Sequence, residues 1–382
     1  MTSNLDRSDT QRPLRVVHVF RTPVGGLFRH VCDLAREQSK LGAHVGIICD
    51  SSTGGKAAAT VLESLDSACD LGIHRVEIQR TPGLSDLLAV RSMRPVLDSL
   101  APNIVHGHGA KGAAYARLLA PSLQSHAVFT PHGGVLHFSA RSLAGRVYIT
   151  LERLLKNRTN GAIFESTFAR QTFLQKIGSA TFPECVIHNG LYEHEYAQLK
   201  REDADYDFVF VGELRTLKGI FEIVEAAAAI RRSRPISLLM VGAGAEEGRL
   251  RARIDQLGMT DNIVVSGPMR PATAAFARAR CVVVPSLDES FPYIVLEALA
   301  AGIPVVTTRV GGIPEMFGSF ADQLIRPGDS EELQKAMLSV LRDPDSAEER
   351  AHALHEHVKH RFRVESMAQQ SIDFYNKISR SK

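Results

Sequence analysis

The chain has 382 residues, of which 44% are hydrophobic and 23% charged, so it is long enough for two soluble domains and too apolar to be disordered. Aromatic residues make up only 6% and Trp is absent, which argues against a surface that binds nucleic acid or long sugar chains by stacking. Residues 1–190 carry 21 Lys and Arg against 14 Asp and Glu, whereas the remainder carries 24 against 28, so we expect the basic first half to meet an anionic partner.

Short runs rich in Val and Ile alternate with amphipathic segments through the first half of the chain. The amphipathic segments predict helices at 28–40 and 84–100. Because short strands separated by helices are typical of βαβ units, we expect a parallel sheet covered by helices. The expected strands are 14–20, 44–49, 104–106, 127–130, 162–165 and 185–188.

A polar, highly charged segment follows at 193–207, and we interpret residues 196–207 as a linker between domains. A second alternating series begins after it, with helices expected at 222–232 and 292–301. Two successive doubly wound halves predict an α/β protein with a cleft where the carboxyl ends of the two sheets face each other, and ligands bind at such edges. The strands expected in this half are 208–211, 237–241, 263–265, 281–285, 304–307 and 323–325.

The most informative segment is ESFPYIVLE, at residues 289–297. Ser290 can cap a helix and Pro292 suits its first turn. If the segment is helical throughout, Glu289 and Glu297 lie about 12 Å apart along the axis. That is about the span of a sugar and a ribose joined by a diphosphate, and helix N-termini favour diphosphates. The spacing alone fits two ordinary surface glutamates equally well.

With ALAAGIPVV at 298–306 and GGIPE at 311–315, this segment resembles the signature of the family 4 retaining glycosyltransferases, of the type that makes bacterial surface polysaccharide and lipopolysaccharide. The resemblance implies the GT-B fold, in which two Rossmann-like doubly wound domains face a central cleft. It implies that Glu289 contacts the donor sugar as a catalytic residue and that Glu297 contacts the ribose. By the same resemblance, Ser290 and Phe291 are expected to bind the donor.

A second match is FVGELRTLKG, at residues 210–219, which follows an expected strand and opens a helix. The family usually has an Arg directly after the first glycine, here Gly212, and a Lys five residues later, both on the donor diphosphate. Lys218 fits the second position, but Glu213 occupies the first, so Arg215 is the expected substitute. Two cations on a leaving diphosphate would replace a metal ion, and we therefore expect no essential metal and no cofactor.

Three turns in the first half also resemble the family. The PVGG loop, with Gly25 and Gly26, would let backbone N–H groups approach a phosphate or the acceptor, although a tight turn explains the same glycines. The TPHGG turn contains His132, an expected catalytic residue that would hydrogen-bond the sugar in the cleft, although a lone histidine at a strand end is more often a structural partner. Lys111, in HGHGAK, could meet an anionic acceptor.

The resemblance covers nearly the whole chain. It implies transfer of a hexose-type sugar from a nucleotide-sugar, with UDP or GDP, to a glycan or lipid-linked acceptor in bacterial envelope polysaccharide synthesis. One alternative is a GT-B sugar-nucleotide epimerase, and another is a non-catalytic sugar-nucleotide-binding partner subunit, which Glu213 leaves open. The implied domains are 1–195 for the acceptor, the linker, 208–361 for the nucleotide-sugar, and a helix at 362–382 that returns to the first domain.

Several features bear on location. Five widely spaced cysteines indicate a reducing compartment, and the polar first 13 residues with no long apolar run indicate a cytoplasmic protein. The basic amphipathic stretch 141–158 can lie on anionic lipid, which makes the inner membrane a candidate peripheral partner, although a solvated helix face is the more common explanation.

Overall fold

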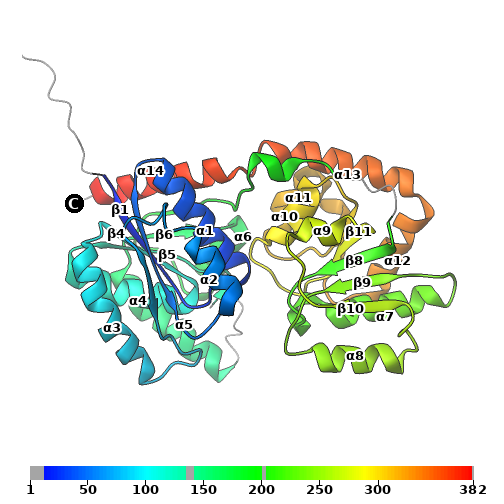
Figure 1. Ribbon diagram of the computed structural model, residues 1–382, viewed down its shortest axis with the longest axis horizontal. Helices are drawn as coiled ribbons and strands as arrows, with labels where there is room; N and C mark the ends of the chain where they lie inside the picture. Colours follow the sequence, from blue (N-terminus) through cyan, green and yellow to red (C-terminus); the bar gives the residue numbers. More distant parts are fainter. Residues whose placement is uncertain (1–12, 135–141, 200–203, 381–382) are drawn as a thin grey trace, which may run out of the picture.

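The structure, a computed structural model, describes residues 13–134, 142–199 and 204–380. Residues 200–203 of the expected linker and Arg141 of the basic stretch lie outside this part of the chain. Two α/β lobes stand side by side (Figure 1). The strands of the first lobe are β1 (Arg15–Phe20), β2 (His44–Asp50), β3 (Ile73–Val76), β4 (Ile104–His108), β5 (His126–Thr130), β6 (Gly161–Phe164) and β7 (Glu184–Val186). Its helices are α1 (Gly25–Lys40), α2 (Gly55–Glu63), α3 (Ser85–Leu100), α4 (Gly109–Leu119), α5 (Leu143–Leu155) and α6 (Thr167–Lys176).

The second lobe has a smaller sheet and a set of shorter helices on its faces. Its strands are β8 (Tyr206–Val211), β9 (Leu238–Val241), β10 (Ile263–Ser266), β11 (Ala279–Val284) and β12 (Val305–Thr307). Its helices are α7 (Ile220–Arg231), α8 (Glu247–Gln256), α9 (Ala272–Phe276), α10 (Tyr293–Ala300), α11 (Ile313–Phe317), α12 (Ser330–Arg342) and α13 (Pro344–Lys359), and α14 (Val364–Arg380) follows.

Both sheets are parallel and doubly wound. The first has the order β3-β2-β1-β4-β5-β6-β7 and the second the order β10-β9-β8-β11-β12. In each, the chain builds strands on one side of the first strand and then crosses to the other side, and ligands bind where the direction switches. The expected class of two Rossmann-like doubly wound α/β domains is therefore confirmed.

The structure differs from the expected strands in three places. Strand β3 was not expected, because its sequence IHRV has a charged residue and no apolar run. Strand β8 begins at Tyr206, inside the expected linker, where the Asp207 carboxylate accepts a bond of 2.9 Å from the backbone N–H of Ser237 and so fixes the start of the strand. The expected strand at 323–325 is present, within the described residues, only as an isolated bridge between Thr308 and Ile325.

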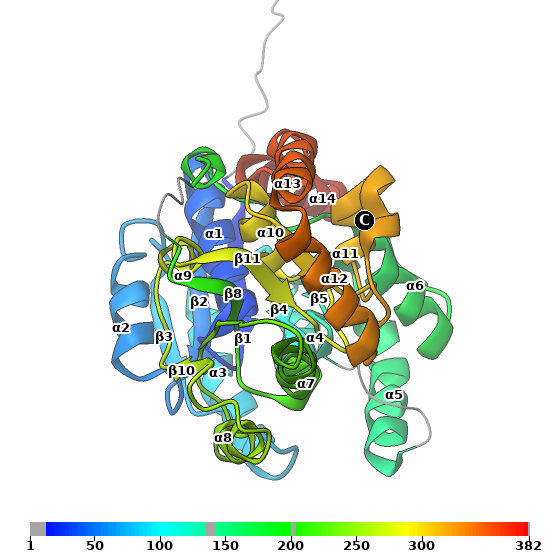
Figure 2. The same ribbon diagram turned by 90° about the vertical axis from the view of Figure 1, so that its right-hand side faces the viewer.

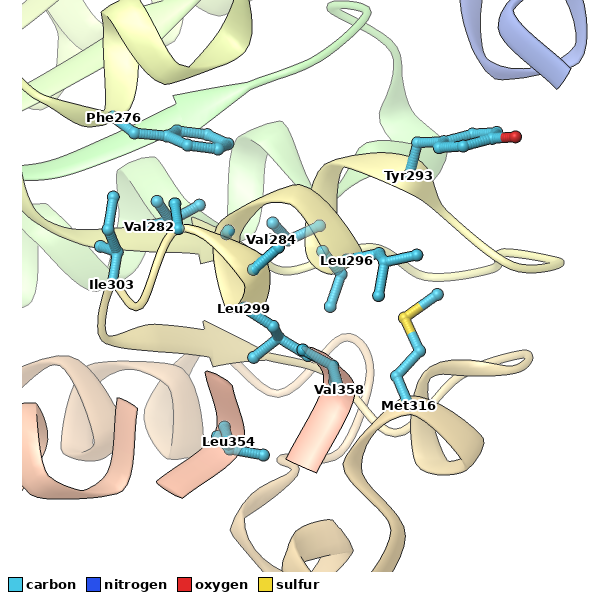
Figure 3. Packing of buried hydrophobic residues seen from close by; sticks show 14 of the residues in the cluster. Phe276, Val282, Val284, Tyr293, Leu296, Leu299, Ile303, Met316, Leu354 and Val358 are labelled. Atoms are coloured by element: carbon cyan, nitrogen blue, oxygen red, sulfur yellow. The ribbon is translucent and has the colours of Figure 1, made fainter. Parts of the chain in front are cut away.

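Helix α10 is anchored by the core of the second lobe. In its sequence, YIVLEALA, every residue except Ile294 and Glu297 is buried. Figure 3 shows Leu296 and Leu299 inside the cluster, while the hydroxyl of Tyr293 points away from it. Because apolar side chains occupy most of the helix surface, its orientation is fixed, and Glu297 is held on the face that the core leaves free.

Helices α13 and α14 join the two lobes. Helix α13 runs along the second lobe and α14 returns over the first (Figure 1), and after a 90° turn both still lie on the same side of the two lobes (Figure 2). Tyr375 and Ile378 of α14 pack with Val16 and Ile104 in the core of the first lobe. Across the described ranges, no helix combines the length and apolarity that a bilayer span needs.

Candidate active site

The two sequence motifs of the second lobe meet in one ion pair. The Nζ atom of Lys218 lies 2.6 Å from Oε1 of Glu289, and the Ser286 hydroxyl donates to the same oxygen at 2.8 Å. Lys218 ends a short 3₁₀ helix, η5 (Thr216–Lys218), after β8, and Glu289 lies between β11 and α10. Because β8 and β11 are neighbours in a parallel sheet, the loops at their carboxyl ends come together.

Glycines allow these loops to pack closely. Gly219 and Gly311 both have positive φ, at +69° and +57°, which disfavours any residue with a side chain. A Cβ added to Gly219 would overlap the carbonyl oxygen of Pro285, and one added to Gly311 would overlap that of Glu289. The glycines of the motifs therefore set the position of the Glu289 loop.

Glu297 pairs across the lobes in this structure. Its carboxylate contacts the guanidinium of Arg29 on α1, which also bonds Glu195 at 2.7 Å and lies 4.5 Å from the ring centroid of Tyr293. Burial raises the pKa of Glu297, and the Arg29 charge opposes that shift. Gly26 lies against the same place, since a Cβ added there would be 3.5 Å from the Tyr293 ring.

The side chain of Arg215 is directed to Glu213 in this structure. This side chain is 44% exposed and its guanidinium is 3.4 Å from Glu213, the acid at the family's usual Arg position. Gly212 directly follows β8 and donates its N–H to the carbonyl of Val241 at 3.0 Å, so it joins neighbouring strand ends. The structure thus pairs Lys218 with Glu289, whereas Arg215, the expected second cation, pairs with Glu213.

Ser290 and Phe291 contact the first lobe. The Ser290 hydroxyl donates to Glu165 Oε2 at 2.9 Å. The Phe291 side chain is buried, with its ring centroid 4.9 Å from that of His188 and 5.5 Å from that of Phe362. Both residues therefore hold the two lobes together in this structure, whereas the sequence motif suggests donor contacts.

His132 lies at the junction of the lobes, directly after Pro131 at the end of β5. Its φ of +48° is rare for a residue other than glycine, and such strain is concentrated at functional sites. Its Nδ1 lies 2.6 Å from Glu165 and its Nε2 lies 3.0 Å from Nδ1 of His108. Both ring nitrogens are occupied, so a sugar hydroxyl could bond this ring only by displacing one of these partners.

Gly25 and Lys111 complete the set of expected residues. Gly25 begins α1 at a φ of +71° with no atom within 4 Å of an added Cβ, so this position needs glycine for its backbone conformation. The amine of Lys111 on α4 contacts the carboxylate of Asp86 and bonds the Thr81 carbonyl at 3.1 Å. Lys111 therefore pairs within the first lobe, and an anionic acceptor would have to compete with Asp86.

The sequence motifs assigned no role to Glu165 or to the buried histidines other than His132. Burial by itself would raise the pKa of Glu165, but His132 beside it and its other partners lower that pKa to about 2. The signal that could have found these residues is a polar side chain inside an apolar strand, as in VVHVF of β1. Among the described residues, two groups of three imidazoles have one nitrogen each within 4.8 Å of the others, close enough to share a metal ion; they are His18, His106 and His108, and His30, His108 and His132.

Comparison with known proteins identifies the family. A model of glycosyltransferase family 4 matches residues 24–193, and one of glycosyl transferases group 1 matches residues 193–361. The chain is also similar to N-acetyl-alpha-D-glucosaminyl L-malate synthase of Bacillus anthracis, with 26% identity over 194 residues, which are 50% of this chain. The match spans 51% of the length of that relative.

Two solved structures share the fold over nearly the whole chain. Sucrose-phosphate synthase from Thermosynechococcus elongatus matches with a TM-score of 0.79 at 20% identity, over 96% of this chain and 100% of that one. Anabaena HepE in complex with UDP and glucose matches with a TM-score of 0.80 at 20% identity, over 95% of this chain and 100% of that one. Since the two family models together extend from residue 24 to residue 361, the chain belongs to the family 4 glycosyltransferases of GT-B fold.

Proposed function

We propose that the protein transfers a hexose-type sugar from a UDP- or GDP-sugar to a glycan or lipid-linked acceptor, with retention of anomeric configuration and without an essential metal. The observation that carries this proposal is the pairing of Lys218 with Glu289 beside the N-terminus of α10, the helix that also holds Glu297. In this proposal, Lys218 would bind the diphosphate, Glu289 would contact the sugar and Glu297 would contact the ribose.

The donor diphosphate would bind at Lys218 and the start of α10. Within the described residues no side chain caps that helix, so the N–H groups of its first turn can bond phosphate oxygens. With the donor bound, the Lys218 amine would contact the diphosphate as well as, or instead of, Glu289. Its charge would stabilise the leaving group as the glycosidic bond breaks. The departing phosphate oxygen would accept the acceptor's proton on the same face, which gives retention.

Binding of the ribose would involve Glu297. Its carboxylate now contacts Arg29 of the first lobe, so the nucleotide would have to share or replace that partner. We infer that the lobes separate for donor entry and close again around it, with the acceptor on the first lobe near Gly25 and Gly26. The UDP and glucose in the HepE complex support a uridine nucleotide as the first donor to test.

Bacterial envelope polysaccharide synthesis remains the proposed setting, with the acceptor on or near the inner membrane. Helix α5 supports a peripheral contact, because it exposes Val147, Leu151 and Leu154 on a segment that also carries Arg146 and Arg153. Exposed apolar and basic side chains on one helix favour the surface of an anionic membrane. The proposed place of action is the cytoplasm, including this membrane face.

The test is turnover of UDP-glucose, UDP-N-acetylglucosamine and GDP-mannose with a panel of acceptors that includes L-malate and lipid-linked saccharides. Nucleotide release would measure the rate, and proton NMR of the product would assign the anomer. We expect Glu289→Gln to lower kcat on the order of 100-fold or more. Glu331→Gln, an exposed acid on α12, is the control and should leave kcat unchanged.

Three outcomes would overturn the proposal. Full activity of Glu289→Gln with the correct donor would remove the central assignment. Conversion of the nucleotide-sugar in the absence of any acceptor would instead favour an epimerase, and donor binding without turnover across the whole panel would favour a sugar-nucleotide-binding subunit.

A further inference from the structure

Three imidazoles converge at the carboxyl edge of the first sheet, near the junction with the second lobe. They belong to His30 on α1, to His108 at the end of β4 and to His132 after β5, and one nitrogen of each lies within 4.8 Å of the others. Nδ1 of His108 lies 3.0 Å from Nε2 of His132. The ring of His30 stands at 75° to that of His132, with centroids 4.7 Å apart. We call these three residues the histidine triad.

Hydrogen bonds on the far side of two of these rings fix their orientation. Nδ1 of His132 lies 2.6 Å from the carboxylate of Glu165, which can only accept. Nδ1 of His30 lies 2.8 Å from Oδ1 of Asn189, whose Nδ2 donates to the Phe291 carbonyl at 2.9 Å and so leaves Oδ1 as the acceptor. An imidazole that binds a metal ion donates its other N–H to a carboxylate or amide oxygen in the same way.

The third ring, that of His108, is oriented by a partner behind it in the sheet. Oε1 of Gln38 on α1 lies 2.9 Å from Nε2 of His18 on β1, and Nδ1 of His18 lies 2.9 Å from Nε2 of His108. Because Oε1 of Gln38 can only accept, His18 donates to it and presents its Nδ1 lone pair to the N–H of His108. Nδ1 of His108 is then left on the side of the triad.

The nitrogens left for a ligand are Nε2 of His30, Nδ1 of His108 and Nε2 of His132. Nε2 of His30 is buried and has no hydrogen-bond partner within the described part of the chain. A Zn²⁺ ion binds imidazole nitrogens at about 2.0–2.1 Å, which places two of them about 3.3 Å apart on a tetrahedral ion. The separation of 3.0 Å between His108 and His132 therefore needs only a small movement to accept the ion.

The second group of close imidazoles, His18, His106 and His108, is less suited to a metal ion. Both nitrogens of His106 are bonded, Nδ1 to the Tyr375 hydroxyl at 2.7 Å and Nε2 to the Thr130 hydroxyl at 3.0 Å. Both nitrogens of His18 are bonded as well. A metal ion at this place would have to replace these partners, so the observations favour the triad.

We propose that the histidine triad binds one Zn²⁺ ion and that this ion inhibits sugar transfer. Three imidazoles suit Zn²⁺ and leave its fourth position open, and the Glu165 carboxylate behind His132 supplies a compensating negative charge. The His132 side chain is only 5% exposed, so the ion enters as the lobes separate. The proposed transfer needs no metal; the ion acts by holding Nε2 of His132, which then cannot bond the donor sugar. The inhibition thus rests on the proposed function, whereas the binding of the ion does not.

Binding can be measured by titration of the intact, chelator-treated protein with Co²⁺. This ion replaces Zn²⁺ in such sites and absorbs visible light strongly when it has four ligands. We expect one Co²⁺ per chain with that spectrum, loss of the spectrum on addition of Zn²⁺, and nitrogen ligands at about 2.0–2.1 Å in X-ray absorption of the zinc form. Wild-type protein that shows no four-coordinate cobalt spectrum would overturn the proposal without any variant.

Three substitutions test which residues hold the ion. His30→Asn removes one ligand and should abolish the cobalt spectrum. Glu165→Gln keeps all three ligands but alters the partner of His132, and it should weaken Zn²⁺ binding about 10–100-fold. His106→Asn is the matched control, because His106 is equally buried but lies outside the triad, and it should retain the spectrum. With folding checked by circular dichroism, a His30→Asn protein that keeps the spectrum, or a His106→Asn protein that loses it, would contradict the assigned site.

Activity provides the second readout. With an identified donor, the chelator-treated wild type should turn over, and saturating Zn²⁺ should lower its kcat about tenfold or more in a way that a chelator reverses. The same Zn²⁺ concentration should leave the rate of His30→Asn at that variant's own value. Zn²⁺ that binds the triad without lowering kcat would refute the inhibitory role. Failure of every protein to turn over any donor, with the cobalt spectrum present, would count against the proposed function and leave the metal site intact.

Discussion

Gly311 shows how a residue with no functional group can determine the position of a catalytic one. Its backbone adopts a φ of +57° and it packs directly on the carbonyl of Glu289. The adjacent Gly312 donates its N–H to the Ser290 carbonyl at 2.6 Å. Gly311 and Gly312 therefore pack against the backbone of the loop that carries Glu289. A side chain at either glycine would displace this loop and move the Glu289 carboxylate away from Lys218.

We predict that Gly311→Ala lowers both stability and transferase activity. The strained φ costs on the order of 1–3 kcal/mol of unfolding free energy, and displacement of the loop should lower kcat about tenfold or more. Urea denaturation and nucleotide release would measure the two effects. Gly248→Ala, on α8 with no atom within 4 Å of the added Cβ, is the control and should raise stability by about 0.5–1 kcal/mol. Equal behaviour of the two variants would contradict this account.

Sequence motifs could identify individual residues that stand at fixed positions within a short recognisable segment of the chain. Lys218 and Glu289 are 71 positions apart and meet because parallel strands align their carboxyl ends. Glu165 and His108 could not be identified in this way, because their role depends on partners from other strands. Arg215 was the expected second cation, but the local turn directs its guanidinium to Glu213.

Helix α6 of the first lobe is capped in part by a side chain from the second lobe. The Glu315 carboxylate on α11 accepts bonds from the backbone N–H groups of Thr167 at 2.9 Å and Phe168 at 3.0 Å. It also lies 2.9 Å from Nε2 of His188. A capping carboxylate normally belongs to the same chain segment as its helix, so this contact ties the helix start to the closed arrangement of the lobes.

We predict that Glu315→Gln destabilises the protein by about 1 kcal/mol at neutral pH, the usual value of a capping side chain. Burial opposes ionisation, but His188 and the two N–H groups prevail and lower the pKa of Glu315 below its ordinary 4.5. Such a carboxylate stabilises the folded state fully above its ordinary pKa and loses that effect as the pH falls through the lowered pKa.

The difference between wild type and Glu315→Gln should therefore be full at about pH 7 and shrink below about pH 4, as measured by urea denaturation. Glu63→Gln, at the exposed end of α2, is the control and should change the unfolding free energy by less than about 0.5 kcal/mol. A difference that grows on acidification would contradict the assigned direction of the pKa shift.

Buried central strands could be predicted from the sequence because they consist of apolar runs, whereas the edge strand β3 could not. The buried strands β1, β2 and β8 contain near-continuous apolar runs, as central strands of parallel sheets do. Strand β3 pairs with β2 at the edge of the first sheet, where His74 and Arg75 are tolerated. Since one side of an edge strand faces solvent, its sequence carries no apolar signal.

At the scale of the whole molecule, several of the described contacts between the lobes are polar, beside the packing of Phe291 on His188. Arg29 with Glu297, Glu165 with Ser290, and Glu315 with α6 all pair a charged group with a partner that a ligand could replace. By contrast, α14 is held on the first lobe by buried side chains such as Tyr375 and Ile378. This division favours a hinge near the α13–α14 connection and reversible closure around a nucleotide-sugar.

Closure around the donor predicts stabilisation by nucleotide. A ligand at 100 times its Kd adds about 2.7 kcal/mol to the unfolding free energy, and a lobe of this size gains roughly 2–4 °C in Tm for each kcal/mol. We therefore expect UDP or the correct nucleotide-sugar to raise the Tm by about 5–10 °C.

Lys218→Met should abolish most of that shift in Tm, because it removes the cation that would bind the diphosphate. The shift is measured from the Tm of the free variant, which should itself fall because the buried Glu289 carboxylate loses its partner. Lys335→Met is the matched control, since Lys335 lies on the surface of α12 in an ion pair with Glu331, and it should keep the full shift. Differential scanning fluorimetry of the three proteins with UDP, GDP and their sugars would decide the matter. An equal rise in Tm for wild type and Lys218→Met would place the diphosphate elsewhere and remove the basis for closure over this loop.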